Sequence, residues 1–199
     1  MTNSRELRLR HQVALEAARI MAGEGVQDFL LAKRKAASRL GVSVARFLPR
    51  NIEIKNALVD YQRLFQSKTQ PNQLRALRET ALEVMQLLSA FRPYLTGEVL
   101  EGTADQYSGI TLHLFADAPE EVVFFLTRNK ISYRTRGRRL RVYQDQYKEY
   151  PDFQFMAGDH CVDLVVFPVN GLRQAPISPA DRKPMSRASL AAVQAMLNA

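Results

Sequence analysis

Hydrophobic residues recur at helical spacing through the first third of the chain. A helix from Ser4 to Met21 is predicted by apolar side chains on one face, namely Leu9, Val13, Ala17 and Ile20. Asp28 is placed to cap a second helix that ends at Gly41, and Asn51 is placed to cap a third that runs to Phe65. The pattern therefore predicts a helical N-terminal region.

A polar stretch with one proline separates this region from the rest of the chain. Residues 67–72 read Ser-Lys-Thr-Gln-Pro-Asn, a composition typical of a linker. We therefore predict a helical, basic domain over residues 1–68 and a second domain over residues 69–199. The second domain opens with an amphipathic helix from Gln73 to Phe91, which Pro93 ends.

Alternation with a period of two residues follows this helix. It predicts strands at Tyr94–Thr96 and Ile110–Ala116, and a third at Cys161–Phe167 that is apolar enough to be covered on both faces. The other predicted elements are a helix opened by Pro119, an extended segment over Ile131–Tyr143 broken at Gly137, a strand at Phe153–Ala157 that forms a hairpin with Cys161–Phe167, a loop from Pro168 to Lys183, and a helix over Ser186–Leu197. This order favours an α+β fold, in which a small mixed sheet of four to five strands is flanked by helices.

Glycine spacing around the first two strands is the most specific motif of the second domain. Gly97 is followed after four residues by Gly102-Thr103-Ala104, and then by Ser108-x-Ile110-x-Leu112. This spacing resembles the signature of the nucleotidyltransferase superfamily, which includes polymerase-β-like enzymes and minimal nucleotidyltransferases. The resemblance covers roughly residues 74–167. It implies the transfer of a nucleoside monophosphate from a nucleoside triphosphate to an acceptor, with Mg²⁺ as the cofactor.

The resemblance carries over only part of the family's functional residues. It implies nucleotide contacts from the turn and the loop after it, through Gly97, Gly102, Thr103, Ser108 and Thr111. The family's first two metal carboxylates fall on Gly109 and Thr111, and its small hydroxyl residue after the first glycine falls on Glu98. Asp163, a lone acid in an apolar strand, matches the third metal carboxylate.

Three residues are candidates for catalysis. They are Asp163 as the metal ligand, Glu98 as a carboxylate on the turn, and His113 as a base on the strand face of Thr111. Each has a structural alternative, such as an Asp163 carboxylate satisfied by an arginine. Because divalent cations need charged oxygen ligands, we expect weak binding of Mg²⁺ and of a triphosphate. The alternative function is a non-catalytic module that binds nucleic acid or a protein on the same fold.

Positive charge is unevenly distributed along a chain whose formal net charge is +8. Residues 1–68 contain 13 basic and 6 acidic residues, an excess of +7, whereas residues 69–199 contain 15 and 14, an excess of +1. We therefore expect the helical domain to contact any polyanion, unless this charge is only a solvated surface. The candidate contacts are Arg5, Arg8, Lys33, Arg34, Lys35, Arg39, Arg46 and Arg50.

A second group of basic residues lies between positions 134 and 141. It consists of Arg134, Arg136, Arg138, Arg139 and Arg141. Arg139 and Arg141 are our candidates for contact with the phosphates of a nucleotide, because guanidinium groups bind phosphate bidentately. A solvated edge strand, on which arginines discourage edge pairing, is the alternative.

Composition indicates the cellular compartment in which the protein works. No apolar run approaches the roughly 18 residues that span a bilayer, and the N-terminus has no apolar core of a secretory signal. Cys161 is the only cysteine, which excludes an intrachain disulfide and fits a reducing cytoplasm. We therefore expect a cytoplasmic protein without membrane contact, with a partner protein or a homodimer among its candidate assemblies.

Overall fold

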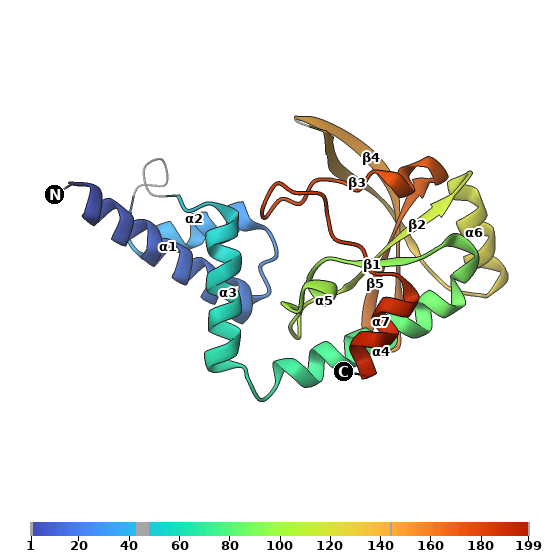
Figure 1. Ribbon diagram of the computed structural model, residues 1–199, viewed down its shortest axis with the longest axis horizontal. Helices are drawn as coiled ribbons and strands as arrows, with labels where there is room; N and C mark the ends of the chain where they lie inside the picture. Colours follow the sequence, from blue (N-terminus) through green and yellow to red (C-terminus); the bar gives the residue numbers. More distant parts are fainter. Residues whose placement is uncertain (1, 43–47, 144, 199) are drawn as a thin grey trace. The chain divides into compact units, whose positions relative to one another are not determined.

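The computed structural model describes residues 2–42, 48–143 and 145–198 (Figure 1). Contacts divide the chain into two units. The first comprises Met1–Pro71, Asp105–Tyr107 and Pro179–Asp181, and the second comprises Asn72–Ala104, Ser108–Ser178 and Arg182–Ala199. Along the sequence, the chain first passes from one unit to the other at Pro71, close to the predicted boundary after Lys68.

Helices α1 (Thr2–Glu24), α2 (Phe29–Arg39) and α3 (Asn51–Phe65) build the first unit. Small side chains dominate their shared core, where Ala17, Ala32, Ala36, Ile20 and Ile54 are fully buried. The Asp28 cap is confirmed, since the Leu31 amide donates to Asp28 Oδ1 over 2.7 Å. The predicted helices are therefore confirmed, although the N-cap of α3 is Arg50 rather than Asn51. Helix α1 extends past its predicted ends on both sides.

A mixed sheet organises the second unit. Its strands are β1 (Tyr94–Thr96), β2 (Ile110–Ala116), β3 (Arg134–Tyr143), β4 (Gln146–Ala157) and β5 (His160–Pro168), in the spatial order β1-β2-β5-β4-β3. β2 and β5 are parallel, and the other neighbours are antiparallel. The predicted α+β fold, with a helical N-terminal region followed by the sheet, is confirmed.

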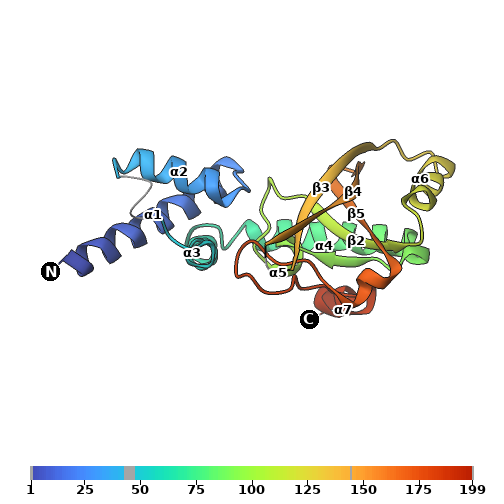
Figure 2. The same cartoon turned by 90° about the horizontal axis from the view of Figure 1, so that it is seen from above.

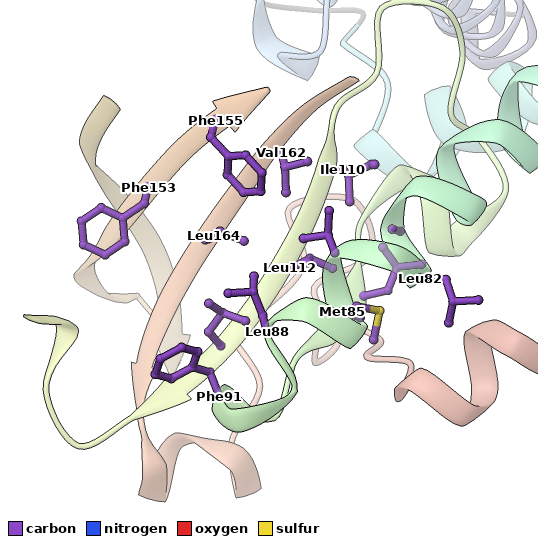
Figure 3. Close-up of a cluster of buried hydrophobic side chains, with 14 of the residues drawn as sticks. Leu82, Met85, Leu88, Phe91, Ile110, Leu112, Phe153, Phe155, Val162 and Leu164 are labelled. Atoms are coloured by element: carbon purple, nitrogen blue, oxygen red, sulfur yellow. The ribbon is translucent and has the colours of Figure 1, made fainter. Parts of the chain in front are cut away.

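The helices of the second unit bury their apolar sides in one cluster on one face of the sheet. They are α4 (Gln70–Leu87), α5 (Glu98–Glu101), α6 (Pro119–Arg128) and α7 (Leu190–Asn198). Figure 2 shows α4 lying along β2 and β5. In Figure 3, Met85 and Leu88 point toward Leu112 and Leu164, and these four side chains are fully buried.

The opposite face of the sheet has its own aromatic cluster. Phe167 of β5 lies between Phe115 and Tyr150, with ring centroids 5.8 Å and 4.3 Å away, and Val165 completes the cluster. β5 thus buries alternate side chains on both faces, which confirms its predicted coverage. We call this side of the sheet the second face.

Two strands differ from their predicted bounds. β3 continues through Gly137 instead of breaking there, and β4 begins at Gln146, ahead of Pro151. Gly137 and Pro151 are partners in the β3–β4 pairing, whereas β4 pairs with β5 only from Asp152 onward. Proline lacks an N–H group, but at this position it removes no bond to a further strand. The strand therefore tolerates a proline that the sequence favoured as a break.

The C-terminal segment also differs from prediction. α7 begins at Leu190 rather than Ser186, because residues 186–188 lie extended along β1. Leu95 and Ala188 exchange two backbone hydrogen bonds of 2.9 Å, and Thr96 Oγ1 donates to the Ser186 carbonyl. The predicted loop after Pro168 contains a 3-10 helix, η2 (Val169–Arg173).

Two smaller points complete the comparison. The predicted N-terminal helix of the second unit is confirmed, but it begins at Gln70 and gives way to a 3-10 turn over Ser89–Phe91. In the described segments, no helix combines the length and the apolar content that crossing a bilayer requires.

Truncating the sheet core should destabilise the fold far more than truncating its surface. We expect Leu112→Ala to lower the free energy of unfolding by about 2–5 kcal/mol, since it removes a fully buried side chain and leaves a cavity. Phe124→Ala is the matched control, because Phe124 on α6 is 73% exposed and should cost within about 0.5 kcal/mol. Urea denaturation monitored by circular dichroism measures both, and equal losses would contradict this assignment of the core.

Candidate functional site

Parallel pairing of β2 with β5 brings the sequence-predicted residues together on the second face. Thr111 lies directly beside Asp163, and His113 lies beside Val165. On the other side of Asp163, Gln154 of β4 is its partner. Neighbouring strands lie about 4.8 Å apart, so Asp163 and Thr111 are adjacent, as the resemblance implies.

Three side chains surround the carboxylate of Asp163. Gln154 Nε2 donates to Oδ1 over 2.9 Å, Arg136 Nη2 lies 3.1 Å from the same oxygen, and Arg138 Nη2 lies 3.7 Å from Oδ2. The side chain of Asp163 is 17% exposed, whereas that of Arg136 is 51% exposed. Asp163 is therefore satisfied by two guanidinium groups and one amide, which is the structural alternative that the sequence left open.

Asp152 is a second acid on this face, and sequence reasoning missed it. Its residue is only 4% exposed, Arg138 Nη1 lies 3.9 Å from its Oδ2, and its Oδ1 has no hydrogen-bond partner. Burial and the nearby Asp163 carboxylate raise the pKa of Asp152, against the opposing effect of Arg138 and Arg136. Extending the predicted strand across Pro151 would have placed Asp152 on the face of Asp163.

His113 is kept neutral mainly by its burial, and an arginine from the C-terminal segment contributes. Arg187 Nε donates to His113 Nδ1 over 3.0 Å, and its Nη1 donates to the carbonyls of Gly171 and Leu172. Burial lowers the pKa of His113 to about 3, and the positive charges of Arg187 and Arg138 contribute. A histidine with this pKa does not take up a proton near neutral pH. His113 is therefore better suited to accept a structural hydrogen bond than to act as a general base.

Arg187 also packs on the aromatic cluster. Its guanidinium carbon lies 4.9 Å from the ring centre of Phe115 and 5.2 Å from that of Phe167. Burial lowers the pKa of Arg187. Because Arg187 follows a loop rich in polar residues and prolines, no periodic pattern in the sequence marks it as part of the site.

The glycine turn has the backbone geometry that the motif predicts. Gly97 is the N-cap of α5 with φ 73°, and Gly102 ends this helix with φ 80°, both in the region that favours glycine. Glu98 accepts a 2.6 Å hydrogen bond from Ser108 Oγ, so these two predicted residues do meet. Thr103 is 5% exposed, and its amide donates to the Glu98 carbonyl. The loop is thus closed by contacts within itself.

The arginines of β3 divide between the two sides of the strand. Side chains alternate along a strand, so Arg136 and Arg138 share the second face, whereas Arg139 and Arg141 point to the other side. Arg141 Nη2 lies 3.1 Å from Asp145 Oδ1, and the Arg139 guanidinium lies over Tyr147. Arg136 and Arg138, rather than the predicted Arg139 and Arg141, therefore reach the carboxylate of Asp163.

Ion pairs occupy part of the predicted nucleic-acid surface in the first unit. Arg39 pairs with Glu16 and Glu24, and Lys35 Nζ lies 3.1 Å from Glu24. The hydrogen bond from Arg39, followed by that from Lys35, holds the pKa of Glu24 below its usual value.

The other predicted contacts differ in their surroundings. Burial lowers the pKa of Lys33, whereas Arg34 is exposed. Arg46 lies outside the described residues. The positive charge of this unit is therefore less available to a polyanion than the sequence count suggests.

Comparison with family models, with curated proteins and with solved structures found no match to this chain. Within the described ranges, no three His, Cys, Asp or Glu side chains gather as a metal site would require. The chemistry of the second face therefore has to be inferred from its own residues.

The neutral state of His113 should make stability depend on pH. Its folded pKa of about 3 lies below its unfolded value near 6.5, so its contribution is complete above about pH 6.5 and is lost as the pH falls toward 3. Two pH units below 6.5, we expect a loss of about 2–3 kcal/mol from this group.

His113→Gln keeps an acceptor for Arg187 but does not titrate, so it isolates this contribution. Urea denaturation of both proteins between pH 7 and pH 4.5 measures the difference in slope. The carboxylates titrate alike in both proteins, so their contributions to the pH dependence cancel in that difference. Equal slopes would show that His113 is protonated or solvated in the folded state.

Proposed function

We propose that this chain is a nucleotidyltransferase-like protein that binds a nucleotide without transferring it. In this proposal the protein is a non-catalytic binding module. The arginines of its second face hold the phosphates of a nucleoside triphosphate in the absence of Mg²⁺. One observation carries the proposal: Arg136 and Arg138 converge on Asp163, beside Thr111, where the resembled family places metal carboxylates.

The charge of the second face favours an anionic ligand. Arg136, Arg138 and Arg187 bring three positive charges to it, whereas Asp163 and Asp152 bring at most two negative ones. The raised pKa of Asp152 reduces its share of negative charge. Arg136 is half-exposed and keeps further guanidinium donors beside the one that meets Asp163, so it can contact phosphate oxygens.

The same residues argue against metal-dependent transfer. A divalent cation needs several charged or carbonyl oxygens. Of the three positions that match the family's metal carboxylates, Asp163 alone holds a carboxylate in this sequence. Both oxygens of Asp163 already face guanidinium groups, which a metal ion would have to displace against like charge. Glu98 is engaged by Ser108, so its carboxylate supports the loop.

Calorimetry with ATP and GTP, with and without Mg²⁺, tests the binding step. We expect binding that does not need Mg²⁺ and that weakens about 10- to 100-fold in Arg136→Gln, because hydrogen bonds to charged groups contribute about 1.5–3 kcal/mol. Arg128→Gln is the control, since Arg128 is an exposed arginine at the end of α6. Binding that depends on Mg²⁺, or an Arg136→Gln protein that binds as the native one does, would contradict the proposal.

Restoring one carboxylate should restore affinity for a divalent cation. We expect Thr111→Asp to bind Mg²⁺ at least about tenfold more tightly than the native protein, since it sets a second carboxylate beside Asp163. Thr111→Asn has nearly the same shape without the charge and should show no gain. The companion change Gly109→Asp is less suitable, because a Cβ there would lie 3.2 Å from the Cys161 carbonyl. Titration with Mg²⁺ followed by calorimetry decides, and equal affinities in all three proteins would refute this geometry.

A further inference from the structure

Half of the formal net charge of the chain lies in one segment, which spans β3 and the first part of β4. Residues 134–150 contain six basic and two acidic residues, an excess of +4 out of +8. The rest of residues 69–199 then has nine basic and twelve acidic residues, a balance of −3. The whole β3–β4 hairpin also contains Asp152, so its excess is +3, and it is a positive region on an otherwise acidic part of the chain.

The outer part of this hairpin is a two-stranded ribbon. β4 pairs with β5 over Asp152–Ala157, whereas Gln146–Pro151 of β4 pair with β3 alone in the described structure. Figure 1 shows the hairpin continuing past the ends of the other strands of the sheet. One side of this ribbon, with Arg139 and Tyr147, is thus exposed to a ligand, whereas on the other side Tyr150 is buried and Leu140 and Val142 pack against the aromatic cluster.

Aromatic side chains lie among the basic ones on the ribbon. Tyr143 is 57% exposed and Tyr147 is 53% exposed, although tyrosine is a residue that usually buries most of its ring. The guanidinium carbon of Arg139 lies 4.8 Å from the ring centre of Tyr147, and Arg141 is the direct cross-strand partner of Tyr147. Arg139, Arg141 and Tyr147 therefore form one surface on one side of the ribbon.

Two acids moderate the charge of this surface. Asp145, whose side chain is 97% exposed, pairs with Arg141, and Glu149 is the cross-strand partner of Arg139. On the other side, Lys148 Nζ lies 5.5 Å from the ring centre of Tyr150. Asp145 and Glu149 balance Arg139 and Arg141 on this surface, so the positive excess of the ribbon comes from Arg138 and Lys148 on the other side. Neutralising Asp145 therefore tests whether the charge of this surface matters.

We propose that this ribbon binds single-stranded nucleic acid. Phosphates meet Arg139 and Arg141, and a base stacks on the exposed ring of Tyr147. Exposed aromatic rings next to cations are the features by which proteins bind single strands of any sequence, since every base has a stacking face. A duplex offers phosphates but keeps its bases stacked inside, so the exposed rings select the single strand. This inference uses the side of β3 opposite to Arg136 and does not depend on nucleotide binding at Asp163.

The experiment is fluorescence anisotropy of labelled twelve-residue oligouridylate and oligothymidylate with the full chain, between 50 and 200 mM salt. We expect Tyr147→Leu to weaken binding about 5- to 100-fold and Tyr147→Phe to retain it, since stacking needs the ring but not the hydroxyl. Arg139→Gln should reduce the slope of log K against log salt by about 0.7, the value for one phosphate contact on a single strand. Asp145→Asn should tighten binding at low salt.

Control measurements make the result decisive. Thermal unfolding of each variant shows that the hairpin is intact, and Arg34→Gln tests the helical unit, where the sequence alone placed polyanion contacts. Binding that is lost in Arg34→Gln but kept in Arg139→Gln overturns the proposal in favour of that unit. Absence of binding at 50 mM salt, equal affinity of Tyr147→Leu and native protein, or equally tight binding of a duplex of the same length also overturns it.

Discussion

Parallel pairing of β2 with β5 sets the geometry of the second unit. These two strands lie next to each other at the centre of the sheet, and both bury side chains on its two faces. Because side chains alternate along a strand, their register fixes which residues meet α4 and which meet the second face. A slip of one residue would exchange the two sets, placing Asp163 in the hydrophobic core and Leu164 among the arginines.

The arrangement of side chains on the second face is explained by the polar groups that this register places there, since each of them needs a partner. Asp163 and Asp152 lie close together and are largely buried, and a buried carboxylate is costly unless it is paired or protonated. β3 and β4 supply the compensation, with Arg136 and Arg138 opposite Asp152 and its neighbour Tyr150. These arginines lie where the resemblance would place a metal ion, so we propose binding of a nucleotide's phosphates rather than nucleotidyl transfer.

Arg187 connects this face to the end of the chain. Its guanidinium reaches His113, the η2 carbonyls and two aromatic rings, while the residues around it pair with β1. This side chain therefore adds to the backbone bonds that hold the C-terminal segment against the sheet, and to the burial that keeps His113 neutral. His113, which the sequence suggested as a base, is therefore a hydrogen-bond acceptor in the structure.

Local patterns of residues were enough to predict most of the helices and strands and their approximate limits. Apolar periodicity predicted the helices and the strands at Tyr94–Thr96 and Ile110–Ala116, because burial on one or two faces leaves a direct trace in the order of residues. The glycine motif predicted the turn at Gly97, since a positive φ has few alternatives to glycine. Asp163 was identified as unusual because a lone acid stands out in an apolar strand.

Which residues meet could not be predicted from local patterns. Strand order and register depend on contacts between residues far apart in the chain, so the approach of Arg136, Arg138 and Asp152 to Asp163 has no local signal. Pairing also overrode local preference, keeping Gly137 and Pro151 inside strands and Ser186 outside α7. The charge counted along the sequence favoured the helical domain as the site of polyanion binding. Ion pairs such as that of Arg39 with Glu24 neutralise part of this charge. The pairing of β3 with β4 gathers the arginines of β3 in one hairpin. The sequence fixes how many charges there are, but their effect depends on distance, and distance is set by the fold.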